Sequence, residues 1–171
     1  MYTLFEHKHR FSAWAASRAA STKTCRFKVE LGQEILETVK NKMLPKSQIL
    51  FDEFHRNNRN LIITEASRLG LKFTHGIAAK LFNCYLKSMY VNDESIDLKI
   101  RKIIHPPIDS LLLKSLYKKN IGDNKNIWKN ASKISWSKFS SNDYETVINK
   151  IIEIYSNEGL WKVEEHWIGH Q

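Results

Sequence analysis

The chain has 171 residues, of which 42% are hydrophobic and 26% charged, and it contains only six glycines and three prolines. This composition excludes a disordered tail, a collagen-like rod and a disulfide-stapled miniprotein, and the length fits one compact domain with a real hydrophobic core. The net charge of +9 resides in residues 1–120, which hold 21 Lys and Arg against 11 Asp and Glu. Such an excess of positive charge favours a polyanionic partner such as nucleic acid.

Charged side chains interrupt the first twenty residues, so neither a secretion signal nor a membrane span is expected there. No later stretch reaches the roughly 20 consecutive apolar residues that a spanning helix needs. We therefore expect a cytoplasmic protein with no membrane partner. Cys25 and Cys84 form no Cys-x-x-Cys pair, which argues against structural zinc and iron–sulfur clusters, and both thiols are expected to be reduced and buried. No metal and no cofactor is predicted.

Apolar residues recur at three- and four-residue spacings along most of the chain, and no strand-like alternation is found, so an all-α fold is predicted. In chain order, helices are expected over residues 4–20, 28–41, 48–69, 75–90, 106–117 and 142–155, followed by a short aromatic segment over 160–168. Residues 91–104 are expected to be an irregular connection, and a Gly-, Asn-, Lys- and Ser-rich stretch precedes the last helix. Pro45 is expected to end the second helix and Gly70 the third, and Thr74 is expected to cap the fourth.

These elements predict a single compact multi-helix domain over residues 1–171. Its core, at about 48–118, would contain a helix-hairpin-helix-like element, and C-terminal helices would occupy 142–168.

The predicted helix over 75–90 carries the first candidate for chemistry. Its apolar side chains gather on one side, whereas Lys80, Asn83 and Lys87 form a polar stripe on the other. A lysine becomes a nucleophile when desolvation or a neighbouring cation lowers its pKa, and it then forms Schiff bases with sugar aldehydes. Lys87 supplies such a cation beside Lys80. The alternative, which the spacing alone favours, is a helix face whose lysines point to solvent.

Asp109 is the second candidate, and it lies at the start of the helix predicted over 106–117. At helical spacing it shares a face with Leu112, Leu113 and Leu116, so a partly dry environment is expected for its carboxylate. A carboxylate held ionised there can stabilise a positively charged sugar as a base departs, or position a catalytic amine. The alternative is that Asp109 only caps its helix.

Several common catalytic signatures are absent, among them a Gly-rich phosphate loop, His-Glu-x-x-His and Gly-x-Ser-x-Gly. What remains is a helix ending at Gly70, a short hairpin, Gly76 opening a helix that carries Lys80, and then Pro107-Ile108-Asp109. Over about residues 60–118 this arrangement resembles the helix-hairpin-helix DNA glycosylases, particularly those that excise oxidised guanine.

The resemblance implies a base-excision DNA glycosylase/lyase that cleaves the N-glycosidic bond of a modified base in duplex DNA. It assigns to Lys80 the attack on the sugar C1′ and to Asp109 the role of the essential carboxylate.

The expected DNA contacts lie around the same hairpin. His75 and Gly76 open a helix whose N–H groups can hold a phosphate, and Lys72 adds positive charge. Arg68, Arg101 and Lys102 are further expected phosphate contacts, together with Arg56 and Arg59. The alternative is that these are turn residues and ordinary surface charges.

Trp161 and Trp167, near the C-terminal end, are expected to pack in the core, with base stacking as the alternative. Two other classes of function stay open. One is a non-catalytic helical module that binds nucleic acid or a protein on a glycosylase-like scaffold. The other is a small enzyme that acts through Lys80 on free nucleosides or another carbonyl compound.

Overall fold

The computed structural model describes residues 1–23 and 25–169, and every regular element in this part of the chain is helical. The predicted all-α class is thus confirmed. The elements are α1 (Leu4–Ala20), α2 (Val29–Glu37), α3 (Gln48–Arg68), α4 (His75–Leu86), the π-helical turn η1 (Lys87–Val91), α5 (Leu98–Ile103), α6 (Ser110–Lys119), the 3-10 turn η2 (Ile121–Asp123), α7 (Lys125–Ile134), the 3-10 turn η3 (Trp136–Lys138), α8 (Ser141–Tyr155) and the 3-10 segment η4 (Leu160–His166).

The hairpin between α3 and α4 forms as its sequence predicts. Gly70 adopts a positive φ of 77°, and the N–H groups of Gly70 and Leu71 donate to the carbonyls of Ser67 and Ala66, which closes α3 with a Schellman motif. Thr74 then caps α4, since its hydroxyl accepts the N–H of Ile77. The chain therefore reverses direction between α3 and α4 within a few residues.

Two predicted boundaries in the first half are wrong. Helix α2 ends at Glu37, well before Pro45, and a turn over 38–41 that includes Asn41 at a positive φ of 59° separates them. The supposedly irregular stretch 91–104 contains α5, which begins where the Asp97 carboxylate accepts the N–H of Lys99. An acidic N-cap thus starts a helix in a segment whose apolar pattern is weak.

Two further corrections concern the second half. The paired prolines precede α6 and lie outside it, because Asp109 is the N-cap and Ser110 the first helical residue. The polar stretch after α6 contains α7, whose Trp128 is fully buried and donates its indole N–H to the Ile121 carbonyl. Trp128 and Ala131 give this helix a buried face, although the segment is otherwise rich in Asn and Lys.

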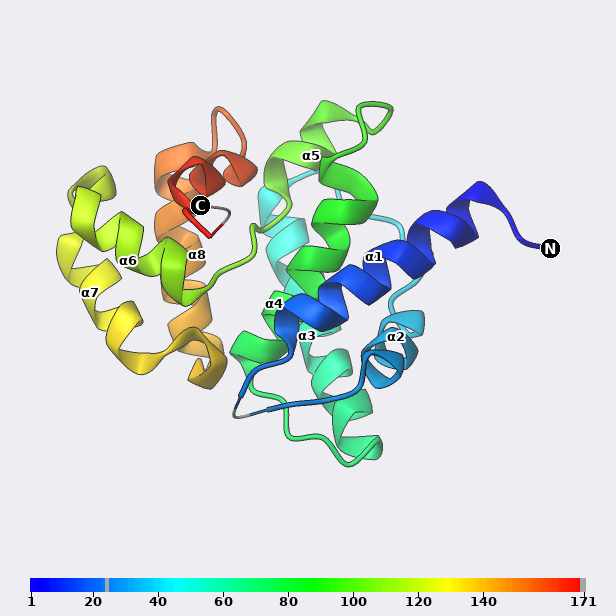
Figure 1. The fold of residues 1–171 in the computed structure, drawn as a ribbon. Coiled ribbons are helices and arrows are strands. Elements are labelled where there is room, and N and C mark those ends of the chain that lie inside the picture. Colours follow the sequence, from blue (N-terminus) through cyan, green and yellow to red (C-terminus); the bar gives the residue numbers. More distant parts are fainter. Residues whose placement is uncertain (24, 170–171) are drawn as a thin grey trace.

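The core has two adjoining parts, with α4 between them. One part is built by α1–α4 around Leu36, Phe51 and Phe82, and the other by α6–α8 and η4 around residues such as Trp128 and Ile151. In Figure 1, α6, α7, α8 and the C-terminal end lie on one side of the molecule and α1–α5 on the other. Because α4 contributes side chains to both parts, residues on this helix can meet groups from either side.

The polar side chains of α4 do not all face solvent, so the expected solvated stripe is wrong for two of its three members. Asn83 is fully buried and its amide donates to the Pro106 carbonyl and to the Tyr144 hydroxyl, both at 2.9 Å. Its side-chain oxygen accepts a 2.7 Å hydrogen bond from His55. Lys80 is only 8% exposed. Asn83 is therefore a connector between the two parts of the core, and Lys80 is placed for an interaction inside the protein.

Candidate active site

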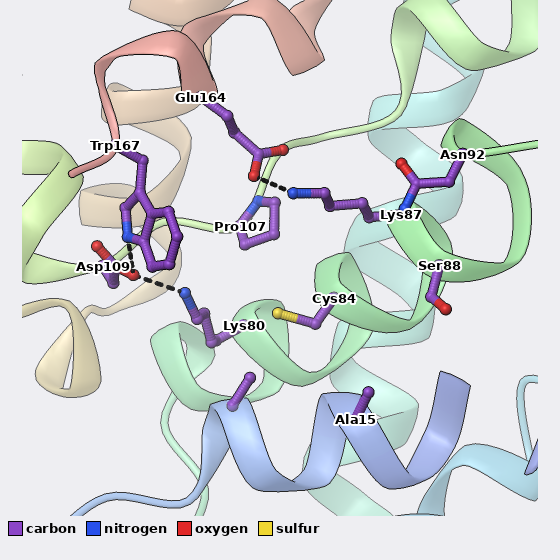
Figure 2. Close-up of a pocket in the computed structure, with 11 residues that line it drawn as sticks. Ala15, Lys80, Cys84, Lys87, Ser88, Asn92, Pro107, Asp109, Glu164 and Trp167 are labelled. Carbon is purple, nitrogen blue, oxygen red and sulfur yellow. Dashed lines mark hydrogen bonds and ion pairs between the residues drawn. The ribbon is translucent and has the colours of Figure 1, made fainter. Parts of the chain in front are cut away.

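Lys80 and Asp109 meet at the junction of the two parts of the core. The Nζ atom of Lys80, on α4, lies 2.9 Å from Oδ2 of Asp109, at the start of α6. Their side chains are only 9% and 17% exposed, respectively. Figure 2 shows the pair at one end of a pocket, with the two side chains approaching from opposite sides. The structure thus joins the two residues that the sequence singled out, in a place where a charge interaction is weakly screened by water.

The two oxygens of Asp109 have separate partners. Oδ1 accepts the backbone N–H groups of Leu111 and Leu112, each at 3.0 Å, and so caps α6. Oδ2 accepts hydrogen bonds from Lys80 and from the indole of Trp167. Burial acts to raise the pKa of Asp109, but the Lys80 charge and these hydrogen bonds outweigh it, so the pKa lies below its ordinary value. Capping and ion pairing are therefore simultaneous roles of one carboxylate.

Trp167 also belongs to the candidate site, although the sequence pattern does not predict a role for it beside Asp109. Its Nε1 atom is 2.9 Å from Oδ2 of Asp109, and the side chain comes from the segment that follows η4 (Figure 2). Its ring also packs against the second part of the core, as expected. Trp161, in contrast, is 43% exposed, so the expected core position of that tryptophan is wrong. The two tryptophans differ in their environment. Trp167 is half-buried, so its indole N–H needs an acceptor inside the protein, and Asp109 supplies one.

A pocket of about 280 Å³ lies beside the ion pair. Its walls come from α1, α4, η1, η4 and the segment before α6, namely Ala15, Ala19, Lys80, Cys84, Lys87, Ser88, Asn92, Pro107, Asp109, Glu164 and Trp167 (Figure 2). Lys87 forms an ion pair with Glu164 across one side of it. Ligand pockets commonly measure roughly 300–1,000 Å³, so this one suits a small group such as a single base or sugar.

Cys84 lies one helical turn after Lys80 and lines the same pocket (Figure 2). It is a free thiol, as is Cys25. Both were expected to be buried, but they are only partly buried and pack against the first part of the core. Burial raises the pKa of Cys84, which keeps its sulfur protonated at neutral pH. Cys84 is therefore not poised to act as a nucleophile at neutral pH.

Gly76, which was expected to help hold a phosphate at the start of α4, uses its N–H inside the protein instead. The N–H of Gly76 donates to the Phe139 carbonyl at 3.2 Å, and Thr74 donates its hydroxyl hydrogen to the Ser137 carbonyl. A Cβ atom on Gly76 would lie 1.8 Å from the carbonyl oxygen of Trp136. Gly76 is therefore required for close packing of α4 against the segment around η3, and its N–H is already used inside the protein.

His75 is also engaged inside the protein, together with an arginine that was expected to contact phosphate. Arg59 is 1% exposed, and its guanidinium donates to Nδ1 of His75, to the Ser141 hydroxyl and to Glu145. Burial and the Arg59 charge lower the pKa of His75, which keeps the imidazole neutral. Both residues join α3 and α4 to α8, and the buried Arg59 is not exposed for a contact with DNA.

The remaining expected DNA contacts lie on the surface and none of them lines the pocket. Arg68 pairs with Glu34 and Glu65, and Arg101 donates to the Ile96 carbonyl. Lys102 donates to the Asn157 carbonyl. Arg56 pairs with Glu145, so each of these four cations is engaged with a different partner in the protein. Lys72, in the α3–α4 hairpin, is exposed.

Comparisons with protein-family models, curated proteins and solved structures found no match. Among the residues that the structure describes, no helix combines the length and apolar character needed to cross a bilayer.

Proposed function

We propose that this protein is a base-excision DNA glycosylase/lyase, which cleaves the N-glycosidic bond of a modified base with Lys80 as nucleophile and Asp109 as the stabilising carboxylate. The observation that carries the proposal is the Lys80–Asp109 ion pair of 2.9 Å at the end of a pocket of about 280 Å³. An amine and a carboxylate held together beside a small cavity are the two groups that this reaction needs. The net charge of +9 supports DNA as the partner.

Lys80 and Asp109 have different roles in the proposed reaction. The Lys80 ammonium gives up a proton to the departing base nitrogen, and its amine forms a bond to C1′ as the bond from C1′ to the base breaks. A further proton then passes from the Lys80 nitrogen to the ring oxygen as the sugar opens, which leaves an iminium between Lys80 and C1′. Asp109 stays ionised, because its pKa is lowered, and so it stabilises positive charge at C1′ during base departure.

Borohydride trapping tests this assignment directly. Hydride adds to C1′ of the iminium and leaves a permanent amine link between the protein and the DNA. We expect an adduct on a duplex with an abasic site, and on a duplex with oxidised guanine after base release, with loss of both adducts in Lys80→Ala.

Lys87 is the matched competitor, since it is the other amine that lines the pocket. The adduct should persist in Lys87→Ala. If it disappears there and persists in Lys80→Ala, the nucleophile is Lys87 and the assignment is wrong. If neither substrate gives an adduct or a released base, the proposed lyase on these lesions is overturned.

A second candidate is a non-catalytic nucleic-acid-binding module on the same scaffold. The observation that favours it is the complete engagement of Asp109, whose oxygens accept hydrogen bonds from two backbone amides, an ammonium and an indole. Such a pattern also suits a purely structural ion pair. The two candidates differ in outcome: the module binds DNA with a steep salt dependence but forms no adduct.

A further inference from the structure

The outer face of α1 carries an unusual exposed group. Phe11 is 60% exposed and Trp14 is 43% exposed, and their ring centroids are 6.0 Å apart. The guanidinium of Arg18 lies over the Trp14 ring at 5.4 Å from its centroid. We call Phe11, Trp14 and Arg18 the aromatic platform. Large aromatic side chains in contact with each other and with a cation, yet left open to water, favour a partner with flat faces and negative charge.

The aromatic platform adjoins the candidate active site. Ala15 and Ala19 line the pocket. Ala15 lies four residues after Phe11 and three before Arg18, the spacings at which side chains are neighbours on a helix surface. Ala19 also borders a second hollow that reaches Lys80, Asp109 and Trp136. Figure 2 shows Ala15 on α1 facing the pocket. Because both alanines are small, the surface continues from the aromatic platform to the ion pair without a large side chain of α1 between them.

The segment that begins at the aromatic platform and continues past α1 is basic, which favours a polyanionic partner. From Phe11 to Val29 the sequence contains Arg18, Lys23, Arg26 and Lys28 and no Asp or Glu. The other two cations of α1, Lys8 and Arg10, are by contrast paired with Asp93 and Glu6.

Lys72, in the α3–α4 hairpin, lies next to the basic segment that follows α1. The thiol of Cys25 contacts the Lys72 carbonyl at 3.7 Å, so the exposed Lys72 lies next to the connection that follows α1. Basic groups therefore extend from the aromatic platform toward the α3–α4 hairpin.

We propose that Phe11, Trp14 and Arg18 form a stacking surface for unpaired bases of the DNA strand whose nucleotide enters the pocket. This inference rests on the proposed function. It specifies that the site prefers DNA with unstacked nucleotides beside the target base to a continuous duplex. Aromatic faces bind unpaired bases with little regard to sequence, and an adjacent arginine adds attraction to both bases and phosphates.

Fluorescence anisotropy with labelled oligonucleotides tests the proposal without any turnover. Two DNA probes of equal length are compared at low salt, one fully paired and one with a short unpaired gap, and neither contains a lesion. We expect Trp14→Ala to weaken binding to the gapped probe by about 5- to 150-fold, the range that loss of one stacked base gives. Binding to the paired probe should change less than about 2-fold, and Trp14→Phe should retain most of the affinity for the gapped probe.

Trp161→Ala is the matched control, since Trp161 is also 43% exposed but lies beside Glu164 and Glu165. It should bind both probes as the unaltered protein does. Equal losses in Trp14→Ala and Trp161→Ala, or an equal effect of Trp14→Ala on both probes, would overturn the proposal. Circular dichroism of each variant confirms that the fold is retained.

The two proposals can fail separately. If trapping on Lys80 succeeds while Trp14→Ala binds the gapped probe normally, the catalytic assignment stands and the stacking surface does not. If trapping fails while Trp14→Ala loses the gapped probe selectively, the aromatic platform belongs to a binding module without this chemistry.

Discussion

Trp167 and Lys80 contact the same oxygen of Asp109, each at 2.9 Å. The indole comes from the C-terminal segment and the ammonium from α4, so two distant parts of the chain fix one carboxylate oxygen (Figure 2). The indole N–H is a neutral donor and Lys80 is a cation, and both favour the ionised carboxylate. Trp167 is therefore a positioning residue for Asp109.

Replacing Trp167 by Phe should raise the pKa of Asp109, because the carboxylate loses one donor. The pKa of Asp109 is lower in the folded protein than in the unfolded chain, so its ionised carboxylate stabilises the fold at pH values above the unfolded pKa. This stabilisation is lost as the pH falls through the folded pKa. The variant should therefore lose about 1 kcal/mol of stability at neutral pH, within the range for one hydrogen bond. Carboxyl-carbon NMR and urea unfolding measure the two effects. Trp161→Phe, at an exposed position, should change neither value, and a similar response in both variants would contradict this role for Trp167.

Asp109→Asn should abolish base release and also destabilise the fold. Asparagine still caps α6, but it leaves the Lys80 ammonium buried without its carboxylate, at an expected cost of about 3 kcal/mol. The double variant Lys80→Met with Asp109→Asn removes that unpaired charge and should recover a large part of the loss. Urea unfolding of both single variants and the double variant gives the coupling energy. Simple addition of the two single effects would mean that the ion pair contributes no coupling to stability.

Stability should fall below about pH 6.5, the ordinary pKa of histidine, because buried histidines must stay neutral in the fold. His55 and His105 have ring centroids 4.5 Å apart, and burial lowers the pKa of both. The half-buried His75 and His166 shift in the same direction. Since the unfolded chain binds more protons in this range, unfolding becomes easier as the pH falls from about 6.5 toward the folded pKa values.

The free energy of unfolding should therefore decrease between pH 7.5 and 5.5, by at most about 1.4 kcal/mol per histidine for each pH unit, and urea unfolding at each pH measures this decrease. His105→Gln should reduce this difference, because it removes one of the two buried imidazoles whose pKa is lowered. A pH dependence that His105→Gln does not alter would show that other groups are responsible. Glu145 cannot account for it, since Arg56 and Arg59 help to lower its pKa to about 2.

Two glycines of the hairpin should respond differently to alanine. Gly76→Ala forces its new Cβ atom against the Trp136 carbonyl oxygen, so we expect a loss of about 3 kcal/mol from overpacking. Gly70→Ala meets no atom within 4 Å, and only its positive φ of 77° costs about 1 kcal/mol. Thermal or urea unfolding distinguishes the two. Equal losses would mean that the contact between α4 and the segment around η3 adjusts freely.

Local signals predicted much of the fold. The apolar repeat of α8 and the Gly70 and Thr74 signals at the hairpin gave the right elements to within a few residues. These features depend on residues near one another in the sequence, which is where a pattern carries most information. Helix α7 was missed because Asn, Lys and Ser dilute its pattern, although Trp128 and Ala131 fall on one buried face.

The site was only partly predictable, because its partners are distant in the sequence. The sequence pattern indicates Lys80 and Asp109 as candidate site residues, and the structure brings them together. Their ion pair depends on how α4 packs against the start of α6, which the pattern does not predict. Asn83 had every local feature of a solvent-facing residue, yet it is satisfied by His55 and Tyr144, which lie on other helices. Burial of a polar residue depends on partners that a helical pattern does not contain.

The division of partners at Asp109 leaves its carboxylate with little rotational freedom. Oδ1 is tied to the first amides of α6 while Oδ2 faces Lys80, so rotation about the side-chain bonds would break the cap and the ion pair together. Ordering a free side chain costs about 0.5–1.5 kcal/mol when a partner binds. Asp109 has already lost this entropy on folding, so a positively charged group that enters the pocket meets a counter-charge whose orientation is set by α6.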